Sequence, residues 1–217
     1  VQAINRAPEP SSWSPWSAAM VPAAPPDAPT GISVSQASPV GGQGQVSVSW
    51  TPPARNNGDA VNEYRVQVYQ GGSLIRTIPS GTATTQNIVL ELSTAAYSFS
   101  VTARNKAGWG AESDRVDRRV AVAPGAPSSV QASAGNNAIS VSYGAAAGNG
   151  ASAAEMSYQF SVNNGGWRSD WDGTNITSGV PNNGSYTVQV RAVSNVSGVV
   201  MEGPASAASN AVEPYGP

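Results

Sequence analysis

The chain has 217 residues, of which 23 are glycine and 17 are proline, and only 11% of them carry a charge. It contains no cysteine and no histidine, which excludes disulfides, thiolate nucleophiles, Cys/His zinc sites and the usual proton shuttle at neutral pH. A net charge of −2 provides no attraction to phosphate, so we expect no nucleic acid partner. No apolar run reaches the roughly 18 residues of a membrane span, and no cofactor motif occurs, so we expect neither membrane insertion nor a cofactor.

Three stretches share one pattern, and a proline-rich joint follows each of them. The stretches are Val1–Ala7, Val101–Ala107 and Val190–Asn195, and the joints are 21–29, 122–127 and 212–217. Their spacing is close to the length of one small β-sandwich domain, about 100 residues. We therefore predict that residues 1–24 are the C-terminal strands of a preceding, truncated domain, that 26–122 and 123–213 are complete domains, and that 214–217 is a linker. Proline-rich joints act as semi-rigid spacers.

The first complete copy shows four rows of apolar residues with period two, which is typical of half-buried strands. The rows are Val46, Val48 and Trp50; Tyr64, Val66 and Val68; Ile88, Leu90 and Leu92; and Tyr97, Phe99, Val101 and Ala103. We expect five of these residues to form the structural core, namely Trp50, Tyr64, Leu92, Tyr97 and Phe99.

The second copy repeats the period-two pattern with different aromatic residues. Its rows are Ile139, Val141 and Tyr143; Tyr158, Phe160 and Val162; and Tyr186, Val188, Val190 and Ala192. We expect Tyr143, Tyr158, Phe160 and Tyr186 to form its core. About seven short antiparallel strands per copy, each with one buried face, predict an all-β chain of tandem two-sheet sandwiches joined by proline-rich linkers.

These residues resemble the fibronectin type III family of immunoglobulin-like β-sandwiches. Trp50 and the following Thr51-Pro52-Pro53 match the end of the family's second strand, and Tyr97 matches its tyrosine corner. The second copy departs from the pattern, because Tyr143 replaces the tryptophan and Ser194 replaces the asparagine at position 105. Tyr186 keeps the corner. The joints are similar to those in repeat arrays of large bacterial, actinobacterial-like extracellular proteins.

Two segments are candidates for surface contacts. Trp109 lies between glycines after the last long strand of the first copy, where a sugar or protein contact is possible. Because the joint at Pro124 follows in the sequence, we prefer packing of Trp109 against the neighbouring module. Asp170, Trp171 and Asp172 form a turn that could hold calcium or stack on a sugar ring, but their spacing differs from a D-x-D-x-D-G loop and favours a solvated turn.

Two further motifs receive a structural interpretation. The stretch Trp13–Ser17 fits the WSxWS motif of class I cytokine receptors, but the chain lacks the cysteines of those receptors, so we expect aromatic packing along a sheet edge. The mixed-charge run 114–119 is interpreted as a solvated edge strand that is protected from pairing with other chains.

The carboxylates are scattered over turns and outward strand positions, which gives no acid pair facing a cleft and predicts no enzyme. The resemblance instead implies a non-catalytic structural spacer or adhesion module of a larger bacterial protein, extracellular or at the cell surface. Its partners would be neighbouring modules and surface protein or polysaccharide. The alternatives are an accessory module of a secreted polysaccharide hydrolase and a protein-binding module of a receptor or phage tail.

Overall fold

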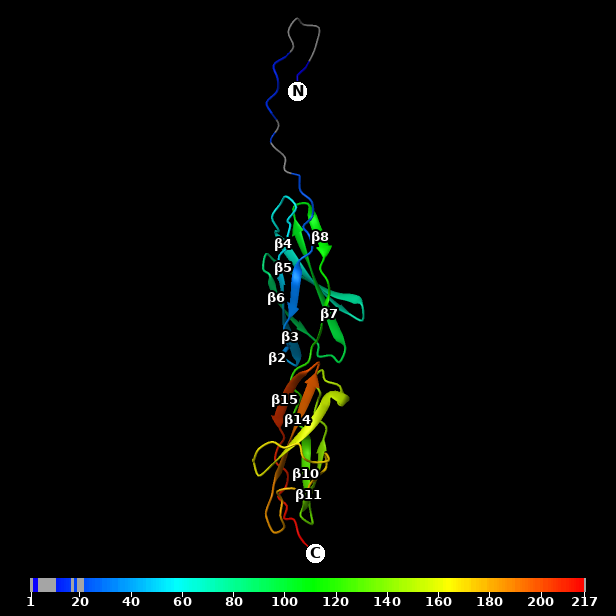
Figure 1. The fold of residues 1–217 in the computed structure, drawn as a ribbon, viewed down its shortest axis with the longest axis vertical. Helices are drawn as coiled ribbons and strands as arrows, with labels where there is room; N and C mark the ends of the chain where they lie inside the picture. Colours follow the sequence, from blue (N-terminus) through cyan, green and yellow to red (C-terminus); the bar gives the residue numbers. More distant parts are fainter. Residues whose placement is uncertain (1, 4–10, 17, 19–21, 217) are drawn as a thin grey trace.

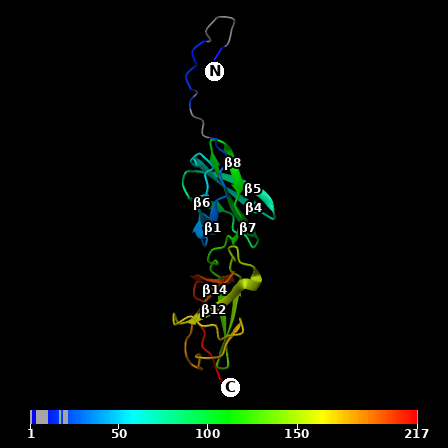
Figure 2. The same cartoon turned by 45° about the horizontal axis from the view of Figure 1, so that its top comes forward.

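The computed structural model describes residues 2–3, 11–16, 18 and 22–216. Within these residues the chain forms fifteen β-strands and one three-residue 3-10 helix. The strands make two sets of antiparallel sheets, which follow one another along the long axis of the molecule (Figures 1 and 2). The all-β prediction is therefore confirmed. No helix in the described residues is long and apolar enough to cross a membrane.

The first set of strands forms two sheets that face each other. One sheet contains β1 (Thr30–Val34), β2 (Ser38–Val40), β3 (Gln43–Thr51) and β6 (Thr85–Leu90), with β3 paired to the other three. The second sheet contains β4 (Glu63–Gln70), β5 (Ser73–Gly81), β7 (Ala96–Asn105), β8 (Gly108–Glu112) and β9 (Val116–Arg119). Strand β7 pairs with β4 over its whole length, and with β8 and β9 on its other side.

The second set is built in the same way from shorter strands. One sheet contains β10 (Ser128–Gly135), β11 (Ala138–Gly144) and β13 (Asn175–Ile176). The other contains β12 (Met156–Val162), β14 (Val188–Val196) and β15 (Val199–Ala205), and the 3-10 helix η1 (Ala153–Glu155) leads into β12. The register of β12 on β14 reproduces that of β4 on β7, because Tyr158 lies opposite Ala192 as Tyr64 lies opposite Ala103.

Each set of sheets encloses its own apolar core. Strand β3 alternates between buried and half-buried residues, as the period-two pattern predicts. In the first core Trp50 and Tyr64 meet edge to face, with 5.5 Å between ring centroids. The structure buries Trp50, Tyr64, Tyr97, Phe99 and Phe160, and it packs Leu92, Tyr143, Tyr158 and Tyr186 against the margins of the cores.

Two tyrosines close the ends of the sandwiches through their hydroxyl groups. The Tyr97 hydroxyl donates to the carbonyl of Glu91 over 3.2 Å. The Tyr186 hydroxyl donates to the carbonyl of Pro181 over 3.3 Å. Each bond satisfies a polar group at the edge of an apolar core and ties a loop to the strand that follows it.

The repeat copy expected at Val1–Ala7 lies mostly outside the described residues. Where the N-terminal region is described, Ser11 donates its backbone N–H to the Ala3 carbonyl over 3.3 Å and accepts the Ala3 N–H on its hydroxyl over 3.0 Å. Trp13 and Trp16 are 72% and 101% exposed. The prediction that these tryptophans pack along a sheet edge is therefore wrong for this structure, because no described sheet lies against them.

Candidate functional site

Trp109 lies on β8, at the end of the first sandwich that receives the N-terminal segment. Its ring stacks beneath two guanidinium groups, with Arg65 at 4.2 Å and Arg104 at 5.6 Å from the ring centroid. The next residue, Gly110, touches the backbone of Pro26, since a Cβ there would lie 2.0 Å from the Pro26 oxygen. Trp109 is thus at the joint before the sandwich. The prediction that it packs towards Pro124 is wrong, because the β7–β8 hairpin turns at the opposite end.

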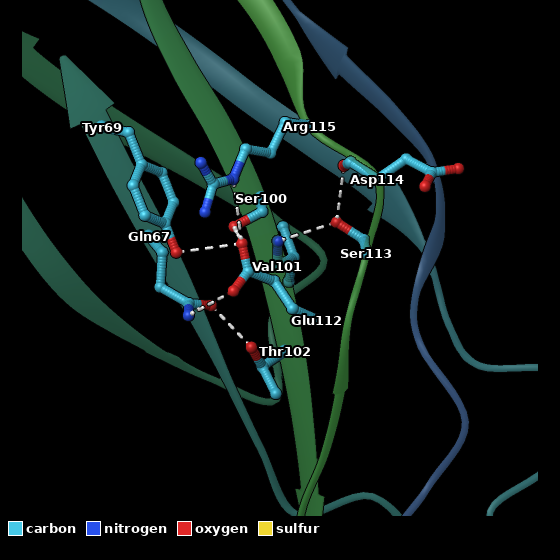
Figure 3. Close-up of polar contacts among 9 residues, drawn as sticks. All are labelled: Gln67, Tyr69, Ser100, Val101, Thr102, Glu112, Ser113, Asp114 and Arg115. Carbon is cyan, nitrogen blue, oxygen red and sulfur yellow. Dashed lines mark hydrogen bonds and ion pairs between the residues drawn. The ribbon is translucent and has the colours of Figure 1, made fainter. Parts of the chain in front are cut away.

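The same face of this sheet carries a network of polar side chains centred on Glu112, at the end of β8 (Figure 3). The Glu112 carboxylate accepts hydrogen bonds from the Ser100 hydroxyl at 2.7 Å, the Tyr69 hydroxyl at 2.9 Å and the Arg115 guanidinium at 3.3 Å. The Arg115 guanidinium also lies 3.5 Å from the centroid of the Tyr69 ring. The network therefore joins β4, β7 and β8 at one carboxylate.

The electrostatics of Glu112 follow from these contacts. Partial burial acts to raise its pKa, but hydrogen bonds from Ser100, Tyr69 and Arg115 outweigh burial and hold the pKa below its usual value. A depressed pKa keeps the carboxylate ionised and makes it a poor general acid at neutral pH. Since the chain's own donors occupy its oxygens, the arrangement suits a structural anchor of β8.

The segment proposed for calcium or sugar is held together by its own side chains. Asp170 forms an ion pair with Arg168 and accepts a hydrogen bond from the Ser178 hydroxyl at 3.0 Å. The bond from Arg168 has the largest effect and the bond from Ser178 the next largest, and they lower the pKa of Asp170 to about 2. The carboxylate of Asp172 accepts from Asn175 and Thr174, and these bonds hold its pKa well below the usual range.

The two aspartates border a shallow open depression of about 420 Å³. A group of three or more acidic side chains suited to a metal does not occur among the described residues. The depression therefore has the features of the solvated turn that the sequence favoured.

Trp171 is half-buried, because its ring packs against the second core while the residue also lines the open depression. Its ring stacks on Tyr143 with 5.8 Å between centroids and an interplanar angle of 23°, and it lies 5.1 Å from Phe160. The indole N–H donates to the Tyr158 carbonyl over 3.2 Å. Trp171 is thus a half-buried packing residue, and its role as a surface contact stays a prediction. This residue supplies the indole that the second copy lacks at Tyr143.

The joint between the two sandwiches contains contacts that the sequence did not predict. Arg119, the last residue of β9, donates to the Glu155 carboxylate and to the Gly150 carbonyl, the latter over 2.5 Å. The hydrogen bond from Arg119 has the largest effect on the pKa of Glu155, and the bonds from Ser152 the next largest. They lower this pKa to about 2. The side chains of Arg119 and Glu155 are only 17% and 25% exposed. The charge run 114–119 is therefore not wholly a solvated edge.

Comparison with known proteins finds a family model that resembles the first sandwich. The family model described as "Fibronectin type III domain" matches residues 27–119. No curated protein matches the sequence.

Among solved structures, the chicken CNTN1 FN1–FN3 domains are 18% identical over 88% of this chain and 67% of that chain, with a TM-score of 0.39. Domains A168–A170 of titin are 26% identical over 45% of this chain and 33% of that chain, with a TM-score of 0.39. Domains d3–d4 of the rat CD45 extracellular region are 23% identical over 45% of this chain and 51% of that chain, with a TM-score of 0.39. This chain thus spans less than two thirds of the titin and CD45 structures. The family match thus shows that residues 27–119 are similar to fibronectin type III domains.

Proposed function

We propose that the chain is a non-catalytic spacer within a larger extracellular or surface protein of bacterial type, and that residues 26–122 and 123–213 are successive fibronectin type III modules. Residues 214–217 would be a linker. Domains of this family are typically structural or binding modules without catalytic activity. The residues nearest to candidate chemistry, Glu112, Asp170 and Asp172, are each engaged by neighbouring donors.

The observation that carries the proposal is the hydrogen-bonded joint. Besides the ion pair of Arg119 with Glu155, the Gln36 side chain donates to the Ala121 carbonyl over 3.0 Å, and the Gly125 N–H donates to the Ala147 carbonyl over 2.8 Å. A proline-rich linker is semi-rigid by itself, and contacts with the sandwiches on either side would restrict it further. Contacts on both sides of the joint support a fixed end-to-end spacing, which is what a spacer requires (Figure 1).

Small-angle scattering of the whole chain tests the proposal. We expect the wild-type profile to fit the extended arrangement with one narrow distribution of particle lengths. Replacement Arg119→Ala should broaden that distribution while leaving the urea unfolding of both sandwiches nearly unchanged. Arg115→Ala, which removes a guanidinium away from the joint, is the matched control and should scatter like the wild type. A broad distribution in the wild type would refute a fixed spacing.

Pull-down with insoluble chitin and cellulose tests the competing role as a hydrolase accessory module. We expect no retention of the wild-type chain. Retention that Trp13→Ala and Trp16→Ala abolish would replace the spacer proposal with carbohydrate binding through the two exposed tryptophans.

A further inference from the structure

Two Asn-Gly pairs occupy equivalent positions, one ahead of β4 and the other ahead of β12. Asn57 and Asn149 both adopt the left-handed backbone conformation, with φ of 54° and 49°. The glycines that follow them, Gly58 and Gly150, have φ of 94° and 95°. The two loops therefore share a local backbone conformation, although β12 begins with an extra 3-10 turn.

Both asparagines bind the chain that enters their sandwich, and they do so with the same atoms. In the first sandwich the Ala24 N–H donates to the Asn57 carbonyl over 2.9 Å, and the Asn57 side-chain amide donates to the Pro25 carbonyl over 2.7 Å. In the second the Val122 N–H donates to the Asn149 carbonyl over 3.0 Å, and the Asn149 amide donates to the Ala123 carbonyl over 2.8 Å. Each asparagine thus forms hydrogen bonds with two consecutive residues of the joint.

The glycines complete the same contact. A Cβ at Gly58 would lie 2.5 Å from the Pro22 oxygen, and a Cβ at Gly150 would lie 2.7 Å from the Val120 oxygen. Real Cβ atoms do not approach backbone this closely, and the left-handed conformation independently favours glycine at both positions. The entering chain is therefore pressed against the glycine and hydrogen-bonded to the asparagine.

We propose that Asn57-Gly58 and Asn149-Gly150 are two copies of one latch that docks the proline-rich joint onto the sandwich that follows it, and that the docking protects both asparagines from deamidation. In deamidation the backbone nitrogen of the glycine attacks the asparagine side-chain carbon and ammonia leaves. Water then opens the resulting succinimide to aspartate or isoaspartate. A side chain held by a joint carbonyl cannot turn towards the glycine nitrogen while the latch is closed.

The chain contains a matched pair of Asn-Gly sequences without a latch. Asn164 and Asn183 also precede glycines and are also left-handed, with φ of 57° and 62°. Both are exposed, and in the described part of the chain no hydrogen bond ties down either side-chain amide. They share the left-handed asparagine with Asn57 and Asn149 but lack the docking contact, and the glycines after them do not have the positive φ of Gly58 and Gly150.

Peptide mapping of the aged, folded wild-type chain tests the latch directly. After incubation at mildly alkaline pH, we expect aspartate and isoaspartate at Asn164 and Asn183, with conversion at Asn57 and Asn149 slower by about tenfold or more, the factor for one typical hydrogen bond. In denaturant all four sites should convert at similar rates. Equal rates at the four sites of the folded chain would overturn the proposal.

A variant gives a second, local measurement. Asn149→Asp puts a carboxylate oxygen against the Ala123 carbonyl, so we expect hydrogen exchange at the Val122 amide to rise about tenfold. Asn164→Asp is the control and should leave that amide unchanged. An unchanged rate in Asn149→Asp would contradict the latch. Neither measurement depends on the spacer function, since a latch can hold its own sandwich whether or not the two sandwiches keep a fixed spacing.

Discussion

One equivalent position, on β7 in the first sandwich and on β14 in the second, shows how a single side chain determines how many hydrogen bonds tie the neighbouring loops to the sheet. Asn105 on β7 is buried, and its amide donates to the carbonyls of Ala24 and Asn56, each over 2.8 Å. Its side-chain oxygen accepts the Ala107 N–H over 2.9 Å. The equivalent residue on β14 is Ser194, which is fully buried and whose hydroxyl has no hydrogen-bond partner. Serine is too short to span the same loop.

We therefore expect opposite outcomes from the two alanine substitutions. Asn105→Ala should lower the free energy of unfolding of the first sandwich by about 1–3 kcal/mol, since it removes a buried amide that makes three hydrogen bonds. Ser194→Ala should leave the second sandwich unchanged or raise its stability by up to about 1 kcal/mol, because it removes an unsatisfied hydroxyl. Urea unfolding followed by NMR signals of each sandwich measures both. A loss above about 1 kcal/mol in Ser194→Ala would show that the hydroxyl has a stabilising partner.

The packing of Trp171 against the second core could not be predicted from the local sequence. The period-two rows placed Phe160 in the core because alternation is a local property of a strand. Trp171 lies in a turn between two aspartates, a pattern that locally indicates solvent exposure. Its burial depends on space beside Tyr143, which is distant in the sequence, so only the folded arrangement could reveal it.

At the scale of elements, β8 depends on Glu112 for its attachment. This strand is short and is paired to β7 through an irregular register, so backbone hydrogen bonds alone hold it weakly. The carboxylate of Glu112 connects it to Ser100 on β7 and to Tyr69 on β4 (Figure 3). The sequence could predict β4 and β7 from their alternation, but not which polar side chains meet across their outer face.

A double-mutant cycle tests this anchor. Glu112→Ala should lower the free energy of unfolding of the first sandwich by about 1–3 kcal/mol, because two hydroxyls lose a charged acceptor. Tyr69→Phe in the Glu112→Ala background should cost less than Tyr69→Phe alone, with a coupling of about 0.5–1.5 kcal/mol. Urea midpoints of the four proteins supply the cycle, and Glu202→Ala, on the second sandwich, serves as the control. Strict additivity would show that the two side chains do not act together.

At the scale of the whole molecule, the joint combines features that the sequence did and did not reveal. The repeat and its proline-rich segments predicted a boundary between two sandwiches at residues 122–127, and this boundary stays a prediction. The pairing of Arg119 with Glu155 was not predictable, because β9 and η1 meet only when both sandwiches are folded and stacked end to end. The Asn-Gly pairs were visible as turns, yet their docking role depends on which backbone approaches them.

The ion pair at the joint makes a prediction about pH. The usual pKa of the carboxyl is 4.5, and in the folded chain the Arg119 bond lowers the pKa of Glu155 to about 2. A depressed pKa means that the contact is fully present above about pH 4.5 and is lost as the pH falls towards 2. We expect an NMR titration of the Glu155 carboxyl carbon to give a midpoint near 2, and Arg119→Ala to move that midpoint up towards 4.5. Arg115→Ala should leave it unchanged. A wild-type midpoint near 4.5 would mean that the joint is open in solution, and the fixed spacing of the two sandwiches would then have to come from the proline-rich backbone alone.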